Sequence, residues 1–149
     1  MNILPYTDEH RIFRESIRKF FEREVVPHIE DWERDRHVSR EVWKKMGDNG
    51  FLCMGVPEAY GGLELDFLYS VILTEELVRT NHSGLGAPLH TDIVVPYLTS
   101  FGSEELKQRL LPGCISGETI TAVAMTEPDA GSDLAAMRTT ARDDGDHVI

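Results

Sequence analysis

The sequence predicts a mainly α-helical domain over residues 1–117, followed by the start of a β domain over residues 118–149. Two patterns support this division. In the first part, apolar residues recur at helical spacing in segments separated by Gly, Pro and capping residues. In the second part, the segment ETITAVAM is rich in Thr and in other residues that favour strands. We therefore expect packed helices first and sheet structure only at the end of the chain.

The composition is that of an acidic globular protein. The chain has a formal net charge of −11, and 41% of its 149 residues are hydrophobic. Disorder is not expected at this apolar content. The negative charge argues against nucleic acid or an anionic membrane surface as a partner, and no apolar run approaches the roughly 20 residues of a membrane helix. A small molecule that carries phosphate remains compatible, because backbone N–H groups can bind it.

The cysteines and the N-terminus indicate a reducing compartment. Cys53 and Cys114 have no CxxC spacing, so no disulfide framework is expected, and a cytoplasmic location fits best. The first residues, MNILPYTDEH, lack a basic stretch followed by an apolar one, so we expect no signal peptide. The six histidines show no ligand spacing, and we expect no metal site.

Capping residues predict the first two helices. Thr7 is expected to cap the first, which Pro27 closes, and Ser39 is expected to cap the second, which Asn49-Gly50 ends. Helical spacing predicts the side chains that face the core. These are Ile12, Phe13, Ile17, Phe20, Phe21 and Val25 in the first helix, and Val42, Trp43 and Met46 in the second.

A third helix is predicted from about Asp66 to Thr80, after an irregular connection over residues 51–65. Apolar residues cover most of its circumference, which predicts a central and largely buried helix. A fourth helical stretch covers roughly 90–101, where Pro96 should bend the helix or mark its start.

The last predicted helix gives way to strands. Ser103 is expected to cap a fifth helix that Pro112 stops. After the ETITAVAM strand, MRTTARDDGDHVI predicts a strand, an Asp-Gly turn and a strand. The last of these strands has only begun at Ile149, so its ladder would lack a partner, and we expect the chain to be a fragment of a longer protein.

The stretch AMTEPDAGSD, residues 124–133, interrupts this strand pattern. A loop that binds a flavin or a pyrophosphate needs small residues and hydroxyl groups, which Thr126, Gly131 and Ser132 supply, and Pro128 would stiffen it. Clusters of this composition are more often plain turns. The residues alone therefore leave both interpretations open.

This stretch resembles the flavin-binding signature of the acyl-CoA dehydrogenases, and the resemblance extends over the whole chain. VPEAYGG at 56–62, TEELVR at 74–79 and FGSEELKQRLLP at 101–112 are similar to that family's early turn, central helix and lead-in to the β domain. SREVW, HSG and GSEE together resemble the long-chain type. The resemblance implies a helical domain, a β domain and a second helical domain, usually assembled as a homotetramer.

The resemblance also implies an activity. The family binds FAD and desaturates a fatty acyl-CoA thioester between its α and β carbons, as in fatty acid β-oxidation. A carboxylate base takes the α proton, the flavin takes the β hydride, and electron-transfer flavoprotein reoxidises the flavin. The catalytic glutamate would lie beyond Ile149, so no residue of this chain is assigned as catalytic.

Ligand contacts follow from the same resemblance. Met125 and Thr126 would lie against the isoalloxazine ring, and Gly131 and Ser132 would reach the pyrophosphate, while Asp129 replaces a common glycine. The implied FAD contacts are Val123, Ala124, Met125, Thr126, Gly131 and Ser132. The implied substrate contacts are Ser132, Leu89, Ile93, Val94 and Tyr97. For the last four of these, core packing is the interpretation that their helical spacing favours.

Four further features are interpreted as structural. Glu127 is expected to be a loop carboxylate, and Glu75-Glu76 to form ion pairs at the surface or between domains. His90 could line the acyl cavity, but packing or solvation is favoured. Arg138 could meet a phosphate, but a cross-strand ion pair is favoured.

Two alternatives remain beside the dehydrogenase. An acyl-CoA oxidase of the same fold would react directly with oxygen, and peroxide formation during turnover would identify it. A non-catalytic helical interaction module is compatible with the length of the helical part. The length of the open reading frame would separate that module from an enzyme.

Overall fold

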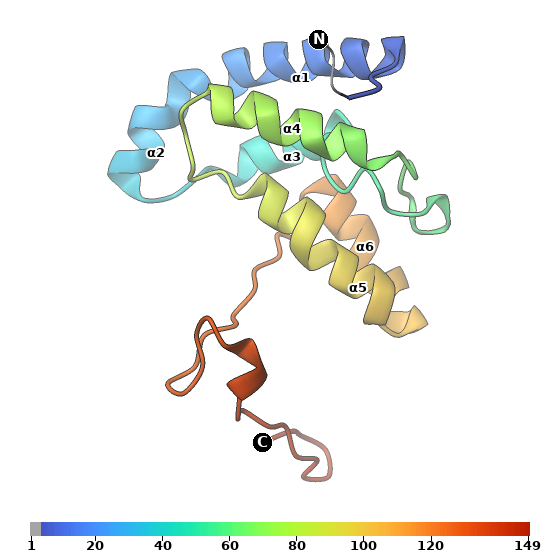
Figure 1. Ribbon diagram of the computed structural model, residues 1–149, viewed down its shortest axis with the longest axis vertical. Coiled ribbons are helices and arrows are strands. Elements are labelled where there is room, and N and C mark those ends of the chain that lie inside the picture. The colour runs from blue at the N-terminus through green and yellow to red at the C-terminus, as the bar shows by residue number, and fades with distance from the viewer. Residues whose placement is uncertain (1–3) are drawn as a thin grey trace.

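The helical body consists of six α-helices within residues 4–149, the part of the chain that this computed structural model describes. Helices α1 and α4 lie side by side, α3 packs on α6, and α5 packs on α6 (Figure 1). Beyond α6 the chain leaves this body as an irregular trace (Figure 1). The α-helices are α1 (Asp8–Glu24), α2 (Ile29–Asp35), α3 (Arg40–Asp48), α4 (Phe67–Arg79), α5 (Val95–Phe101) and α6 (Glu104–Ser116). The shorter turns are η1 (Val26–His28), η2 (Glu58–Tyr60), η3 (Leu89–Val94) and η4 (Leu134–Ala136).

Helix α1 begins as predicted. The Thr7 hydroxyl accepts the His10 N–H, and the His10 ring accepts the Thr7 N–H, so each residue satisfies an orphan donor of the other. The predicted core face is confirmed for Ile17, Phe20, Phe21 and Val25, and Phe13 packs against it. It is wrong for Ile12, which is 66% exposed. Ile12 lies about 100° around the helix axis from Phe13, outside this stripe.

Helix α2 was not predicted. It follows the short turn η1, in which Pro27 occupies an early position where its missing N–H costs nothing. Trp32 is its one buried residue. A single buried residue in seven gives no periodic signal, so the helix is held by packing that the local sequence does not show.

Helices α3 and α4 have the predicted limits. Ser39 and Asp66 cap them, each accepting a backbone N–H. The predicted burial of α4 is correct on only one side, since Ile72 is fully buried while Phe67 is 71% exposed. One face of α4 packs on α1 and the core, and the other is open in this structure.

The two helical prolines occupy different parts of their helices. Pro96 lies in the first turn of α5 but does not mark a helix start, because the chain is helical without a break from 87 through the π-helical turn η3 to 101. Pro112 does not stop α6, which continues to Ser116 and ends at Gly117 with φ of 74°. Because Leu111 and Cys114 on either side of Pro112 are fully buried, their packing outweighs one lost helical hydrogen bond.

The predicted strands are absent from the described chain. Within residues 4–149, pairing outside the helices is limited to isolated bridges at Glu127–Ala130 and Asp143–Val148. The predicted Asp-Gly turn does form, since the Asp144 N–H donates to the His147 carbonyl at 2.9 Å. The segment 118–125 has strand composition but no neighbouring strand, and a strand requires a partner. The proposed domain boundary after residue 117 stays a prediction.

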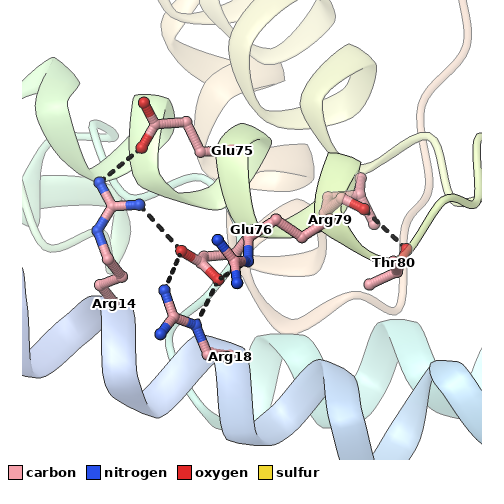
Figure 2. A network of polar contacts seen from close by, with 7 residues as sticks. Arg14, Arg18, Glu75, Glu76, Arg79 and Thr80 are labelled. Carbon is pink, nitrogen blue, oxygen red and sulfur yellow. Dashed lines mark hydrogen bonds and ion pairs between the residues drawn. The ribbon is translucent and has the colours of Figure 1, made fainter.

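A network of ion pairs joins α1 to α4 (Figure 2). Glu76 on α4 receives hydrogen bonds from Arg14 and Arg18 of α1 at 2.8–2.9 Å, and Arg79 approaches it at 3.5 Å. Glu75 pairs with Arg14 at 2.6 Å. The expectation of surface or interdomain pairs is therefore wrong for Glu76, whose side chain is only 1% exposed between two helices of one body.

None of the helices described here is both long and apolar enough to cross a membrane.

Candidate functional site

The polar stretch after α6 folds as a tight turn with exposed arms. Glu127 and Ala130 exchange two backbone hydrogen bonds of 3.0 and 3.2 Å, which closes the turn over Pro128 and Asp129. All six residues predicted to contact FAD are exposed, four before this turn and two after it. They are Val123, Ala124, Met125 and Thr126, then Gly131 and Ser132.

Glu127 holds this turn in place. Its carboxylate accepts hydrogen bonds from the backbone N–H groups of Arg138 and Thr139 and from the Thr139 hydroxyl. The Thr139 hydroxyl, followed by the two N–H groups, lowers the pKa of Glu127. The structural role predicted for Glu127 is confirmed. Arg138 forms an exposed ion pair with Asp129 at 3.5 Å, although no strands flank it as predicted.

The backbone of the turn accommodates Asp129, the residue that replaces a glycine common in the family that the chain resembles. Within the described residues, positive φ angles outside glycine occur only at Arg36, Cys53, Glu64 and Asn81. Asp129 therefore has a negative φ, and its side chain imposes no left-handed strain. At Gly131, no atom lies within 4 Å of the place a Cβ would occupy, so the backbone there is open to close approach.

Four of the five predicted substrate contacts lie on η3 and α5, and most of them are exposed, while Ser132 lies after the turn that follows α6. Core packing, the interpretation favoured by their spacing, is wrong for Leu89, Ile93 and Tyr97, which are 37%, 43% and 59% exposed. Val94 is half-buried. Ile93 lines an apolar hollow of about 330 Å³ between α4 and η3, together with Phe67 and other residues.

A second hollow of about 240 Å³ adjoins the first, because both are lined by Phe67, Ser70 and Asp92. Burial raises the pKa of Asp92, and a hydrogen bond from Ser70 opposes this shift. Cys53 also lines the second hollow, and burial raises the pKa of its thiol to about 12. A thiol of this kind is not a nucleophile at neutral pH.

The structure does not bring the turn after α6 and the two hollows of the helical body together in one site. Among residues 4–149, no hydrogen bond or ion pair connects the segment 122–149 to the helical body, from which it extends (Figure 1). His90 is fully buried, as the packing interpretation predicted, and lines neither hollow. No cluster of three or more His, Cys, Asp or Glu residues that could hold a metal occurs in the described part of the chain.

A family model described as acyl-CoA dehydrogenase, N-terminal domain, matches residues 7–118. The chain belongs to the acyl-CoA dehydrogenase family. A curated relative, the mitochondrial long-chain specific acyl-CoA dehydrogenase of Sus scrofa, is 47% identical over 97% of this chain and 34% of its own length. The Mus musculus protein of the same name is 46% identical. These relatives confirm the resemblance to the long-chain type of acyl-CoA dehydrogenase.

Solved acyl-CoA dehydrogenases share the fold. The enzyme from Geobacillus kaustophilus matches 97% of this chain and 38% of its own with 55% identity and a TM-score of 0.91. An acyl-CoA dehydrogenase complexed with FAD, from Bacillus anthracis, matches 92% of this chain and 24% of its own with 34% identity and a TM-score of 0.83. The fold class predicted for the helical part is confirmed. The chain spans about a third of the length of the curated relatives it matches.

Sequence patterns did not reveal the α4 side of the apolar hollow. The whole helix was predicted to be largely buried, yet Phe67, which lines the hollow, is 71% exposed. The available signal was the excess of apolar residues around α4, which exceeds what one buried face requires.

Proposed function

We propose that this chain is the N-terminal part of an FAD-dependent acyl-CoA dehydrogenase that desaturates a fatty acyl-CoA. Family membership over residues 7–118 carries the proposal. The exposed turn after α6 and the apolar hollow on α4 are the two surfaces that such an enzyme would use. The catalytic base would come from outside this chain.

The turn after α6 fits a flavin. The backbone groups of Met125, Thr126, Gly131 and Ser132 make no backbone hydrogen bonds within the described chain, and all four residues are exposed. Their N–H groups and two hydroxyls are therefore available to ring and phosphate oxygens. When bound, FAD would supply the hydride acceptor for the desaturation. Val123 and Ala124 would lie along the same face, and Ser132 would also approach the CoA part of the substrate.

The hollow between α4 and η3 fits the tail of an acyl chain. Phe67, Val71, Pro88 and Ile93 form the apolar part of its lining, beside Ser70, Thr74, Glu75 and Asp92. Burial of an alkyl tail against the apolar part is favourable by about 0.8 kcal/mol per methylene. Leu89, Val94 and Tyr97 remain proposed contacts around it. Electron-transfer flavoprotein as acceptor, a homotetramer and a cytoplasmic location are parts of the same proposal, although the Sus scrofa relative is named mitochondrial.

The first test is spectroscopic. The complete protein that contains this chain should purify with a flavin absorbance spectrum, and anaerobic addition of a saturated long-chain acyl-CoA should bleach it. Bleaching without peroxide formation in air, together with reduction of electron-transfer flavoprotein, identifies the dehydrogenase. Peroxide formation at the turnover rate identifies the oxidase of the same fold. A protein without flavin would refute the proposal.

A bulky residue in the hollow should shorten the preferred substrate. Ile93→Trp fills part of the hollow, so the acyl-CoA with the highest kcat/KM should be shorter by several carbons, and each excluded methylene should cost about 0.8 kcal/mol. Val78→Trp is the matched comparison, since Val78 is an exposed apolar residue of α4 that lines neither hollow, and its replacement should leave the preferred length unchanged. Equal chain-length profiles in wild type and Ile93→Trp, with unchanged melting temperature, would place the acyl tail elsewhere.

A further inference from the structure

Hydrogen bonds attach the segment that leads to the proposed flavin contacts to the helical body as far as Thr121. Its first residues are tied down: the Arg40 guanidinium donates to the Glu118 carbonyl at 3.1 Å, and the Thr119 N–H donates to the Gly113 carbonyl at 2.9 Å. Two residues later, Thr121 contacts His90. Beyond Thr121, the described chain makes hydrogen bonds and ion pairs only within itself.

His90 makes both contacts of this last attachment. Its Nδ1 accepts the Thr121 backbone N–H at 3.2 Å and lies 2.8 Å from the Thr121 hydroxyl oxygen. Its Nε2 lies 3.0 Å from the Cys114 carbonyl oxygen in the last turn of α6 and 3.4 Å from the Cys53 Sγ. The imidazole therefore bridges η3, α6 and the departing chain.

These partners fix the protonation state of the ring. The Thr121 N–H can only donate, so Nδ1 must accept, and the proton of a neutral imidazole is on Nε2. The Cys114 carbonyl is the matching acceptor. A second proton on Nδ1 would face the Thr121 N–H and remove that hydrogen bond, which would leave only the contact with the Thr121 hydroxyl. Burial, which outweighs the bond to Cys114, lowers the pKa of His90 and so favours the neutral form.

Packing in the core holds the His90 ring in this position. His90 is fully buried, and the Trp43 ring meets it edge to face with centroids 5.6 Å apart. On the next residue, the Thr91 hydroxyl accepts the Cys53 N–H at 3.2 Å, which fixes η3 against the connection before α4. The acceptor for Thr121 is thus held by the core of the helical body.

We propose that His90 is a positioning residue for flavin binding, because it holds Thr121 and so sets the point from which the chain reaches the FAD contacts. An extended chain spans about 3.5 Å per residue, so Met125, four positions on, must lie within about 14 Å of this point. The effect on flavin rests on the proposed function, whereas the attachment itself rests on the geometry of His90.

Two substitutions separate the contacts of the ring. Asn places its amide near the position of Nδ1 and can still accept from Thr121, while Gln places its amide near Nε2 and can still donate to Cys114. His37→Gln is the matched control, because His37 is exposed and its side chain makes no hydrogen bond in the described chain. All variants are made in the complete protein that contains this chain.

Three quantities are measured: amide hydrogen exchange at Thr121, the dissociation constant for FAD, and the melting temperature. In His90→Gln, loss of one buried hydrogen bond should speed Thr121 exchange and weaken FAD binding by about tenfold each. His90→Asn should stay within about threefold of wild type in both quantities, and His37→Gln should match wild type. Equal losses of melting temperature in His90→Gln and His90→Asn, with unchanged exchange and FAD affinity, would overturn the proposal.

The two proposals fail in different ways. If the wild-type protein binds no FAD, the proposed function is wrong, and Thr121 exchange alone decides the attachment. If His90→Gln does not fold, the ring nitrogen chemical shifts of His90 in the wild-type protein decide, since the attachment requires an unprotonated Nδ1 and a protonated Nε2. A neutral ring with its proton on Nε2 would support the attachment. A proton on Nδ1 would overturn it.

Discussion

Replacing Glu76 with Gln should lower the free energy of unfolding by about 2–3 kcal/mol, the range for a buried charge pair whose partners are partly exposed. The Glu76 side chain is 1% exposed, and it accepts from Arg14 and Arg18 of α1 (Figure 2). An amide keeps one acceptor, but its NH₂ group would face guanidinium donors. It also leaves three arginines around an uncharged group. Thermal unfolding should show a melting temperature lower by roughly 5–10 °C.

Glu75→Gln is the matched control on the adjacent residue. The Glu75 side chain is 48% exposed and pairs with Arg14 alone, so its loss should cost less than about 1 kcal/mol. Similar losses in the two variants would show that the buried network does not hold α1 to α4.

Acid titration gives a second measure of the same network. Hydrogen bonds from Arg18, and then from Arg14, lower the pKa of Glu76 although burial opposes them. The stability this provides is present above the unfolded pKa of about 4.3 and is lost as pH falls through the lower folded value. Urea unfolding between about pH 5 and 3 should therefore show a weaker pH dependence in Glu76→Gln than in wild type.

Gly62→Ala should cost about 3 kcal/mol, the upper range for a substitution that the surroundings cannot accommodate. A Cβ at Gly62 would overlap the backbone carbonyl of Val56. That carbonyl accepts the Glu64 N–H at 3.0 Å, and the Gly62 N–H donates to the Pro57 carbonyl at 3.2 Å. The connection could relieve the overlap only by breaking these bonds, so the variant should melt at a clearly lower temperature.

The adjacent glycine supplies the comparison. Gly61 has φ of 86°, but no atom lies within 4 Å of the place a Cβ would occupy there. Gly61→Ala should therefore cost only the left-handed strain of about 1 kcal/mol. If the two alanine variants melt together, contact with Val56 does not determine the shape of this connection.

Local signals predicted much of the helical body. The caps at Thr7, Ser39 and Ser103 depend on residues within one turn of each other, and all are confirmed. Helix α2 and the burial of Glu76 could not be predicted, because both depend on partners far along the chain. Glu76 meets Arg18 across 58 positions.

The candidate site divides in the same way. Composition alone suggested a special turn at 124–133, and the structure shows that Glu127 ties it to Thr139. The link between His90 and Thr121 spans 31 positions, and no spacing rule connects them. The strand composition of residues 118–125 was visible in the sequence, but a ladder also requires a partner strand, which no local pattern can supply.

The turn η3 matters for comparing this chain with its relatives. The Val95 N–H donates to the His90 carbonyl, five residues back, where an α-helix would use four. The helix therefore contains one extra residue at this turn without forming a loop. In a relative that lacks one residue within 89–94, this turn would be ordinary α-helix. Side chains after the turn should therefore be matched between the two proteins by their position on α5, and not by counting residues from α4.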